Sequence, residues 1–451
     1  MVRAHWASRS GFILAAAGSA IGLGNIWKFP YIAGHHGGGA FVLIYLFFVA
    51  FVGLPLMIGE VSLGRAAQIS PVGAFRRFGA ENRLWPGIGF LGVTAAFLLL
   101  SFYAVVAGWA MHYTWEAATG ALPGAADGEA DQHFAAVTEN SALCVGWQVG
   151  FMTLVTLVVW RGIRGGIEKS CRIMMPALAL MMLYLFAHAL NSSGFAEALN
   201  FIFGLHTDRL TAAGVLEALG HAFFTLSLGV GGMITYGSYL DKKTDVVGTS
   251  ILISGLDTGF ALLACMIFFP IVFSFGLSPE AGPGLVFVSL PIAFAQMSGG
   301  VVLAFVFFLL LVFAALSSAV SLLEIVVSYF IDEKGWTRHQ AVLVSGLGVT
   351  AFGIPSSLSS STDLFGESII AITGKNWFDS VDYLVSNWML PMGGMGLALF
   401  MAWRMNAAAR LEAYGDQSRW LRFYGLWLAL LKWFIPLSIF LVLLNLIGVF
   451  G

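Results

Sequence analysis

Long, uninterrupted runs of apolar residues recur along the whole chain. Eleven of them reach the length, about 17 residues or more, that a helix needs to cross a bilayer. Apolar and polar residues do not alternate within these runs, which argues against a membrane β-barrel. The pattern therefore predicts an all-α polytopic membrane protein with eleven transmembrane helices. These are expected at residues 10–34, 40–64, 86–115, 141–160, 171–190, 214–239, 246–276, 298–331, 338–354, 378–403 and 421–448.

Composition supports this prediction, and charge adds an orientation. Only 10% of the 451 residues are charged, and the mean hydropathy is +0.86, whereas a soluble domain is about a quarter charged. Of the 22 Lys and Arg residues, Arg209 and Lys375 fall in loops on one side, and Lys28 and Lys432 lie within spans. The other 18 (22 − 4) fall on the opposite side, which the positive-inside rule makes cytoplasmic. We expect a multi-pass inner-membrane protein with a cytoplasmic N-terminus and an external C-terminus.

Two of the predicted spans contain residues that weaken a helix near its middle. The stretch SAIGLGNIWKFPY (19–31) interrupts the first span, and LSLGVGG (226–232) interrupts the sixth. Close packing through small residues explains one such span, but matching interruptions five spans apart favour an inverted-repeat transporter with a site at the midplane. Unwound backbone cannot stay unpaired in hydrocarbon, so a polar ligand or ion can bind there. Helix ends near Ala20, Gly24 and Thr225 suit a zwitterion together with sodium.

The interrupted stretches also carry a family resemblance. The motifs GSAIGLGNIWKFPY, GGGAFVLIY, GLPLMIGEVSLGR and AFFTLSLGVGGMITYGSY resemble those of the neurotransmitter:sodium symporter family, in its bacterial amino acid transporter branch. The resemblance implies a single transmembrane transporter domain over 1–451, built as a 5+5 inverted repeat with discontinuous helices 1 and 6 (the LeuT fold). It places repeat one at about 10–190, repeat two at about 214–403 and an extra helix at about 421–448.

The resemblance further implies a substrate site between the two interruptions. A substrate carboxylate would meet the backbone N–H groups of Leu23 and Gly24 and the hydroxyl of Tyr103. The ammonium group would meet carbonyls of Ala20, Phe224 and Thr225 and the side chain of Ser227. Monoamine carriers of the family have an Asp where this chain has Gly22, so glycine predicts an amino acid. The remaining pocket residues are mostly apolar and predict neutral hydrophobic L-amino acids, both aliphatic and aromatic; they are Leu99, Val230, Ser318 and Leu322.

Two sodium sites and no organic cofactor follow from the same resemblance. The first sodium would bind Ala20, Asn25, Thr225 and Asp257 together with the substrate carboxylate. The second would bind Gly18, Ile21, Ala314, Ser317 and Ser318. Asp257 departs from the family pattern, which has Asn there. A carboxylate within a span is functional by default, so we expect Asp257 to replace chloride near the first sodium. Whether protonation of Asp257 also couples transport to a proton stays open.

Closing elements on both sides of the site are implied as well. The outer gate would use Lys28 and Asp382 as a charged pair, with Tyr103 and Phe224. The inner gate would use Arg3, Trp6, Tyr239, Glu324 and Asp332. Gly166 and Pro176 match a pattern with which relatives unwind the inner end of helix 5. Glu60 resembles a glutamate of span 2 that accepts hydrogen bonds from the interruption in span 6.

Three other functions are weighed against transport. An intramembrane enzyme is not expected, because no nucleophile dyad or zinc-protease spacing occurs in the sequence. An amino acid sensor would bind the same ligand without moving it. A carrier of another small amine coupled to protons alone has only Asp257 in its favour. The sequence gives no sign of a nucleic acid partner, and it leaves the oligomeric state, the sodium stoichiometry and the preferred amino acid open.

Overall fold

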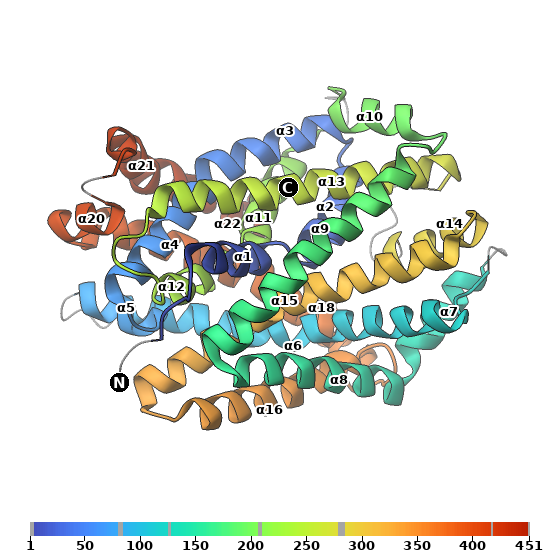
Figure 1. The fold of residues 1–451 in the computed structure, drawn as a ribbon, viewed down its shortest axis with the longest axis horizontal. Coiled ribbons are helices and arrows are strands. Elements are labelled where there is room, and N and C mark those ends of the chain that lie inside the picture. Colours follow the sequence, from blue (N-terminus) through green and yellow to red (C-terminus); the bar gives the residue numbers. More distant parts are fainter. Residues whose placement is uncertain are drawn as a thin grey trace.

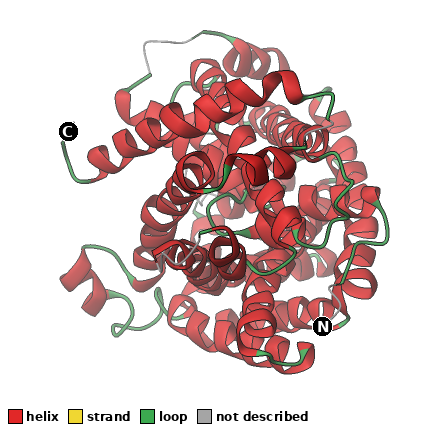
Figure 2. Ribbon diagram, turned by 90° about the vertical axis from the view of Figure 1, so that its left-hand side faces the viewer, coloured by secondary structure: helices red, strands yellow, loops and turns green. Residues whose placement is uncertain are grey.

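The structure is a computed structural model that describes residues 4–79, 84–124, 128–205, 210–277, 285–415 and 418–449. Within these ranges every regular element is a helix, as Figures 1 and 2 show. Nine helices there are long and apolar enough to cross a membrane, and the bent pair Arg9–Ala20 and Gly24–His35 makes a tenth. The expected eleven spans are reached when the interrupted pair α11 (Ala212–Thr225) and α12 (Gly232–Gly237) is counted as one.

The helices of the first half of the chain extend to residue 189, and the η elements among them are π-helical turns. In order they are α1 (Arg9–Ala20), η1 (Gly24–Lys28), α2 (Phe29–His35), α3 (Gly39–Phe48), η2 (Val49–Gly53), α4 (Leu54–Ala67), α5 (Pro71–Phe78), α6 (Leu84–Thr119), α7 (Glu129–Glu139), α8 (Ser141–Trp160), η3 (Ile163–Glu168) and α9 (Lys169–Ala189).

The second half begins with the short helix α10 (Phe195–Phe203). After α11 and α12 follow α13 (Val246–Ser274), η5 (Leu285–Ser289), α14 (Leu290–Gln296), α15 (Gly300–Lys334), α16 (Arg338–Ser357), α17 (Glu367–Thr373), α18 (Trp377–Tyr383), η6 (Leu384–Met389), α19 (Leu390–Leu399), η7 (Phe400–Arg404), α20 (Ala407–Tyr414), the 3-10 turn η8 (Leu421–Phe423), α21 (Tyr424–Ala429), η9 (Leu430–Phe434) and α22 (Ile435–Leu446).

The long helices run roughly parallel to one axis, so the molecule has two ends (Figure 1). The N-terminus, α5 and α20 lie at one end, which we call the N-terminal end; α7, α10 and α14 lie at the opposite end. Seen from the N-terminal end, the helices surround a central region (Figure 2). Helix α1 is buried along Ala15–Ala20 and packs against α9, α13 and α15. The interrupted first span is therefore surrounded by other helices.

The first interruption lies where the sequence places it. Helix α1 ends at Ala20, and the chain resumes as the π-helical turn η1 at Gly24, with a bend of 50° between the two halves. Ile21 is extended, with φ −73° and ψ 94°, so the helical hydrogen-bond ladder stops there. The expected ends at Ala20 and Gly24 are confirmed.

The second interruption is longer and needs unusual backbone conformations. Helix α11 ends at Thr225, as expected, and α12 begins at Gly232. Between them Gly229 and Gly231 have φ of 83° and 79°, which glycine adopts at little cost. Ser227 also has a positive φ of 52°, which is uncommon for a residue with a side chain. The surrounding structure must therefore hold this segment in place.

Glu60 of α4 supplies part of that support. Its two carboxylate oxygens accept hydrogen bonds from the backbone N–H of Gly229 (2.8 Å) and of Met233 (3.2 Å). All three groups are buried, so the side chain pairs donors that unwinding has left without helical partners. The glutamate thus fixes both the end of the interruption and the start of α12.

We predict that Glu60→Gln lowers the stability of the protein. The amide presents one oxygen and one N–H2 group, so one buried backbone donor loses its acceptor, at a cost of about 1–3 kcal/mol. The thermal midpoint of the purified protein measures this. Glu197→Gln on α10, where the side chain is exposed, is the matched control and should leave the midpoint unchanged. Equal midpoints for the two variants would contradict the role given to Glu60.

Candidate functional site

The two interruptions face each other across one cavity. Its lining comes from α1 and η1, from α6, from the α11–α12 interruption and from α15, with Leu390 of α19. All twelve residues expected at the substrate site line it: Ala20, Gly22, Leu23, Gly24, Leu99, Tyr103, Phe224, Thr225, Ser227, Val230, Ser318 and Leu322. Ser19 and Leu390 complete the lining and were not anticipated. Residues more than 300 positions apart in the chain therefore form a single site.

One wall of the cavity is polar and is formed mainly by backbone. The N–H of Leu23 donates to Tyr103 Oη at 3.2 Å, and the N–H of Gly22 donates to Asn25 Oδ1 at 3.1 Å. A β-carbon on Gly22 would lie 2.5 Å from Ser318 Oγ, and one on Gly24 would lie 2.9 Å from the Phe224 ring. Glycine is therefore needed at both positions for the neighbouring helices to approach the backbone this closely.

A buried carboxylate connects the two interruptions beside this wall. Asn25 Nδ2 donates to Asp257 Oδ1 at 2.7 Å and to the Asp257 carbonyl at 3.1 Å. Thr225 Oγ1 lies 3.2 and 3.1 Å from the two carboxylate oxygens. All three side chains are buried, with Asp257 and Asn25 fully so. Asp257 thus brings together three of the four residues expected at the first sodium, and its carboxylate is the one acidic group among them.

The residues expected at the second sodium lie where the end of α1 meets α15. Ser318 Oγ donates to the carbonyls of Gly18 (3.2 Å) and Ser19 (3.1 Å), and Ser317 Oγ donates to the Ala314 carbonyl (3.0 Å). A β-carbon on Gly18 would lie 3.1 Å from Ser317 Cβ, so the two residues touch. Ile21 is the buried residue that follows α1. Hydroxyl and carbonyl oxygens of α1 and α15 therefore gather at this point.

Ser19 has contacts that the sequence did not suggest. Its carbonyl also accepts from Ser227 Oγ at 2.9 Å, and its hydroxyl lies 2.7 Å from Ser321 Oγ. The carbonyl therefore links the end of α1 to the interruption after α11 and to α15. No residue type in the sequence marks such a role, because it is performed by the main chain.

The pair of Lys28 and Asp382 that was expected at the outer gate is not formed, although both residues are described. Lys28 Nζ lies 4.4 Å from the centroid of the Phe224 ring, a cation–π contact, and Asp382 accepts from Ser386 Oγ at 2.6 Å. Lys28 and Phe224 line a second cavity of about 340 Å³ with residues of α11, α19 and α22. Phe224, which also lines the central cavity, separates the two.

At the N-terminal end, Trp6 forms hydrogen bonds with the carbonyls at and just after the end of α12. Its Nε1 donates to the Tyr236 carbonyl at 3.0 Å, and its backbone N–H donates to the Tyr239 carbonyl at 3.2 Å. Tyr239 Oη donates to Glu324 Oε1 at 2.7 Å. Arg338, which the sequence did not suggest, forms an ion pair of 2.6 Å with the fully buried Glu324.

The other two residues expected at the inner gate are Asp332 and Arg3. Asp332 accepts from the backbone N–H of Ser70 at 2.6 Å and has a further interaction besides. Arg3 lies outside the described residues.

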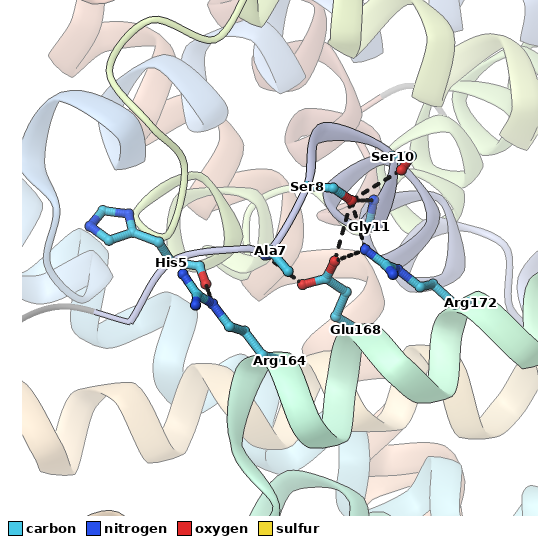
Figure 3. Close-up of polar contacts among 8 residues, drawn as sticks. All are labelled: His5, Ala7, Ser8, Ser10, Gly11, Arg164, Glu168 and Arg172. Carbon is cyan, nitrogen blue, oxygen red and sulfur yellow. Dashed lines mark hydrogen bonds and ion pairs between the residues drawn. The ribbon is translucent and has the colours of Figure 1, made fainter.

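The N-terminal segment is also held to η3 and to the start of α9, as Figure 3 shows. Glu168, almost fully buried, accepts from the backbone N–H of Ala7 at 2.8 Å and pairs with Arg172 Nη2 at 2.5 Å. Arg164 donates to the His5 carbonyl at 2.7 Å. Gly166 lies in the π-helical turn η3, two residues before Glu168. Pro176 lies inside α9, eight residues after it. The sequence did not predict the contacts of Glu168.

Comparisons with known proteins agree with this geometry. The model of the sodium:neurotransmitter symporter family matches residues 3–141 and 133–445. An uncharacterized sodium-dependent transporter of Bacillus subtilis is 40% identical over 99% of this chain and 98% of its own length. One of Methanocaldococcus jannaschii is 32% identical over 89% of this chain and 82% of its own length.

A solved structure adds the fold. The crystal structure of MhsT in complex with L-phenylalanine is 44% identical, with a TM-score of 0.90 over 98% of this chain and 99% of that one. The all-helical architecture with two interrupted helices, the family model and these relatives lead to one conclusion. The chain is an integral membrane protein that belongs to the sodium:neurotransmitter symporter family of sodium-dependent transporters.

Proposed function

We propose that this protein imports neutral hydrophobic L-amino acids, aliphatic and aromatic, together with sodium by alternating access. One observation carries the proposal: two interrupted helices border a single cavity that is polar on one wall and apolar on the other. The likeness to MhsT, whose structure contains L-phenylalanine, supports the substrate class. We further propose an inner-membrane location, with the N-terminus in the cytoplasm and the C-terminus outside.

The proposed substrate lies between the interruptions as a zwitterion. Its carboxylate meets the N–H groups of Leu23 and Gly24 at the start of η1, where the helix dipole favours negative charge, and the hydroxyl of Tyr103. Its ammonium meets the carbonyls at Ala20, Phe224 and Thr225 and the hydroxyl of Ser227. Leu99, Val230 and Leu322, all buried and on the cavity wall, then surround an apolar side chain. Burial of that apolar surface contributes about 25 cal/mol per Å².

The first sodium in this proposal binds beside the substrate carboxylate. Asp257 already stands within hydrogen-bond distance of Asn25 and of Thr225, and its carboxylate supplies oxygen atoms and one negative charge for a hard cation. Thr225 would add its hydroxyl oxygen, and Asn25 would add Oδ1, which accepts from the Gly22 N–H in this structure. The Ala20 carbonyl and the substrate carboxylate complete the set. Because ion and substrate share this set, each raises the affinity of the other by the same factor.

The second sodium binds where α1 meets α15. The carbonyls of Gly18, Ile21 and Ala314 and the hydroxyls of Ser317 and Ser318 would hold it. This set is neutral, and hydrogen bonds join several of its members. It therefore links the half of the first span that must move toward the cytoplasm to a helix of the surrounding bundle.

Alternating access requires that one gate opens while the other stays closed. In the proposal, release inward separates Trp6 from α12 and frees the N-terminal segment from Glu168 of η3. Unwinding between Gly166 and Pro176 then lets water reach the second sodium. On the outer side, Lys28 over Phe224 takes part in closure. Asp382 joins that gate only if Lys28 leaves the aromatic ring.

We predict sodium-driven accumulation of labelled L-phenylalanine in proteoliposomes that contain the full chain. Replacing external sodium by potassium should abolish it, and unlabelled leucine or tryptophan should compete.

Gly22→Ala should reduce uptake at least about tenfold, because the added methyl group meets Ser318 Oγ in the site. Gly87→Ala, at a glycine with open space around it, is the matched control. Binding without accumulation would identify a sensor, and uptake driven by a proton gradient without sodium would identify a proton-coupled carrier; either result contradicts the proposal.

We also predict that transport does not need chloride. In the proposal Asp257 supplies the negative charge beside the first sodium, so replacing chloride by gluconate on both sides of the membrane should leave the uptake rate unchanged. Asp257→Asn should raise the sodium concentration for half-maximal uptake, while Asp379→Asn at an exposed position of α18 should not. Loss of most of the uptake without chloride would contradict this assignment.

A further inference from the structure

Two histidines and a glutamate converge at the end of the molecule opposite the N-terminus, away from the central cavity. His112 and Glu116 lie one turn apart near the end of α6, and His133 lies on α7. Glu116 Oε1 is 3.2 Å from His112 Nε2, and Glu116 Oε2 is 2.8 Å from His133 Nε2. One ligand atom from each side chain lies within 4.8 Å of the others. His112 and Glu116 are buried and His133 is partly exposed, so solvent reaches the group from one side.

We propose that His112, Glu116 and His133 form a binding site for Zn²⁺ or a chemically similar divalent transition-metal ion. Two imidazoles and one carboxylate are a common three-ligand set for zinc, with a water in the fourth position. Tetrahedral bonds of about 2.0–2.2 Å separate neighbouring ligand atoms by about 3.3–3.5 Å. The nitrogen–oxygen distance of 3.2 Å at His112 is close to this range, and that of 2.8 Å at His133 is at least about 0.5 Å shorter. Side-chain rotations that move the three ligand atoms to equal separations would admit the ion.

The ligand chemistry separates this site from the sodium sites. Imidazole nitrogen suits zinc, copper and nickel, whereas sodium, magnesium and calcium prefer oxygen ligands. The residues around the site are mainly aromatic: the Tyr113 ring lies 5.7 Å from the His133 ring, and the Trp147 ring lies 5.8 Å from the His112 ring. Such a surrounding limits hydration on the buried side and favours direct metal–ligand bonds.

The site joins α6 and α7, and both helices contact η5 through aromatic side chains. Phe134 of α7 stacks on Phe287 of η5 with ring centroids 5.5 Å apart, and Tyr113 of α6 lies 5.2 Å from the same ring. A bound ion would tie α7 to α6 and thereby enclose Phe287 more firmly. The metal site does not depend on the proposed function.

Equilibrium dialysis of the purified, chelator-treated full chain tests the proposal. The buffer contains Zn²⁺ as the probe, with excess Na⁺ and Mg²⁺ present. We expect one Zn²⁺ per chain in the wild type, with an affinity at least about 100-fold weaker in His133→Gln, which removes a direct ligand. His188→Gln is the matched control, since this partly exposed histidine of α9 contacts Tyr184 and lies on a helix that contributes nothing to the site. It should bind as the wild type does.

A second measurement covers the case in which His133→Gln fails to fold. Co²⁺ added to the wild type should give the intense visible absorption of a four-coordinate ion with nitrogen ligands, and Zn²⁺ should displace it. Absence of stoichiometric Zn²⁺ binding, equal binding by wild type and a folded His133→Gln, or a Co²⁺ spectrum of the aqueous ion would each overturn the proposal. Glu116 would then only join the two histidines by hydrogen bonds. Because these readouts are independent of transport, their failure is distinct from failure of the proposed function.

Discussion

The need to pair every backbone polar group inside a membrane governs this structure. Interrupting two helices within the bundle removes helical partners from N–H and C=O groups in a region where water cannot replace them. Side chains from elsewhere in the chain pair these groups. Glu60 accepts from the N–H groups of Gly229 and Met233. Tyr103 accepts from the N–H of Leu23, and Ser227 donates to the carbonyl of Ser19. Unwound backbone is thereby held in place next to a cavity, where its remaining groups are available to a ligand.

Buried charges follow the same rule, because each carboxylate has specific donors around it. Asp257 has Asn25 and Thr225, and Glu324 has Tyr239 and Arg338. A buried charge without partners costs several kcal/mol, so these groups tie distant helices together as long as the donors stay close. The Glu324 pair closes the N-terminal end around Trp6 and α12. The Asp257 group joins the two interruptions at the place proposed for the first sodium.

The sequence predicted the parts of the fold that follow from local rules. Glycine-rich interruptions in apolar spans located the helix ends at Ala20, Gly24 and Thr225, and the family motifs selected the residues that line the cavity. Contacts between long side chains were less predictable, because such side chains can choose among several neighbours. Lys28 lies over Phe224 instead of reaching Asp382, and Arg338 occupies a place at Glu324 that no motif marked. His112 and Glu116 have helical spacing, but the arrival of His133 depends on how α7 packs.

The central claim is that substrate and sodium share one set of ligands between the two interruptions. Binding of L-phenylalanine and of sodium to the purified protein, each measured with and without the other, tests it most directly. The account predicts that sodium strengthens phenylalanine binding at least about tenfold and that phenylalanine strengthens sodium binding by the same factor. Equal affinity for phenylalanine in the presence and absence of sodium would contradict it.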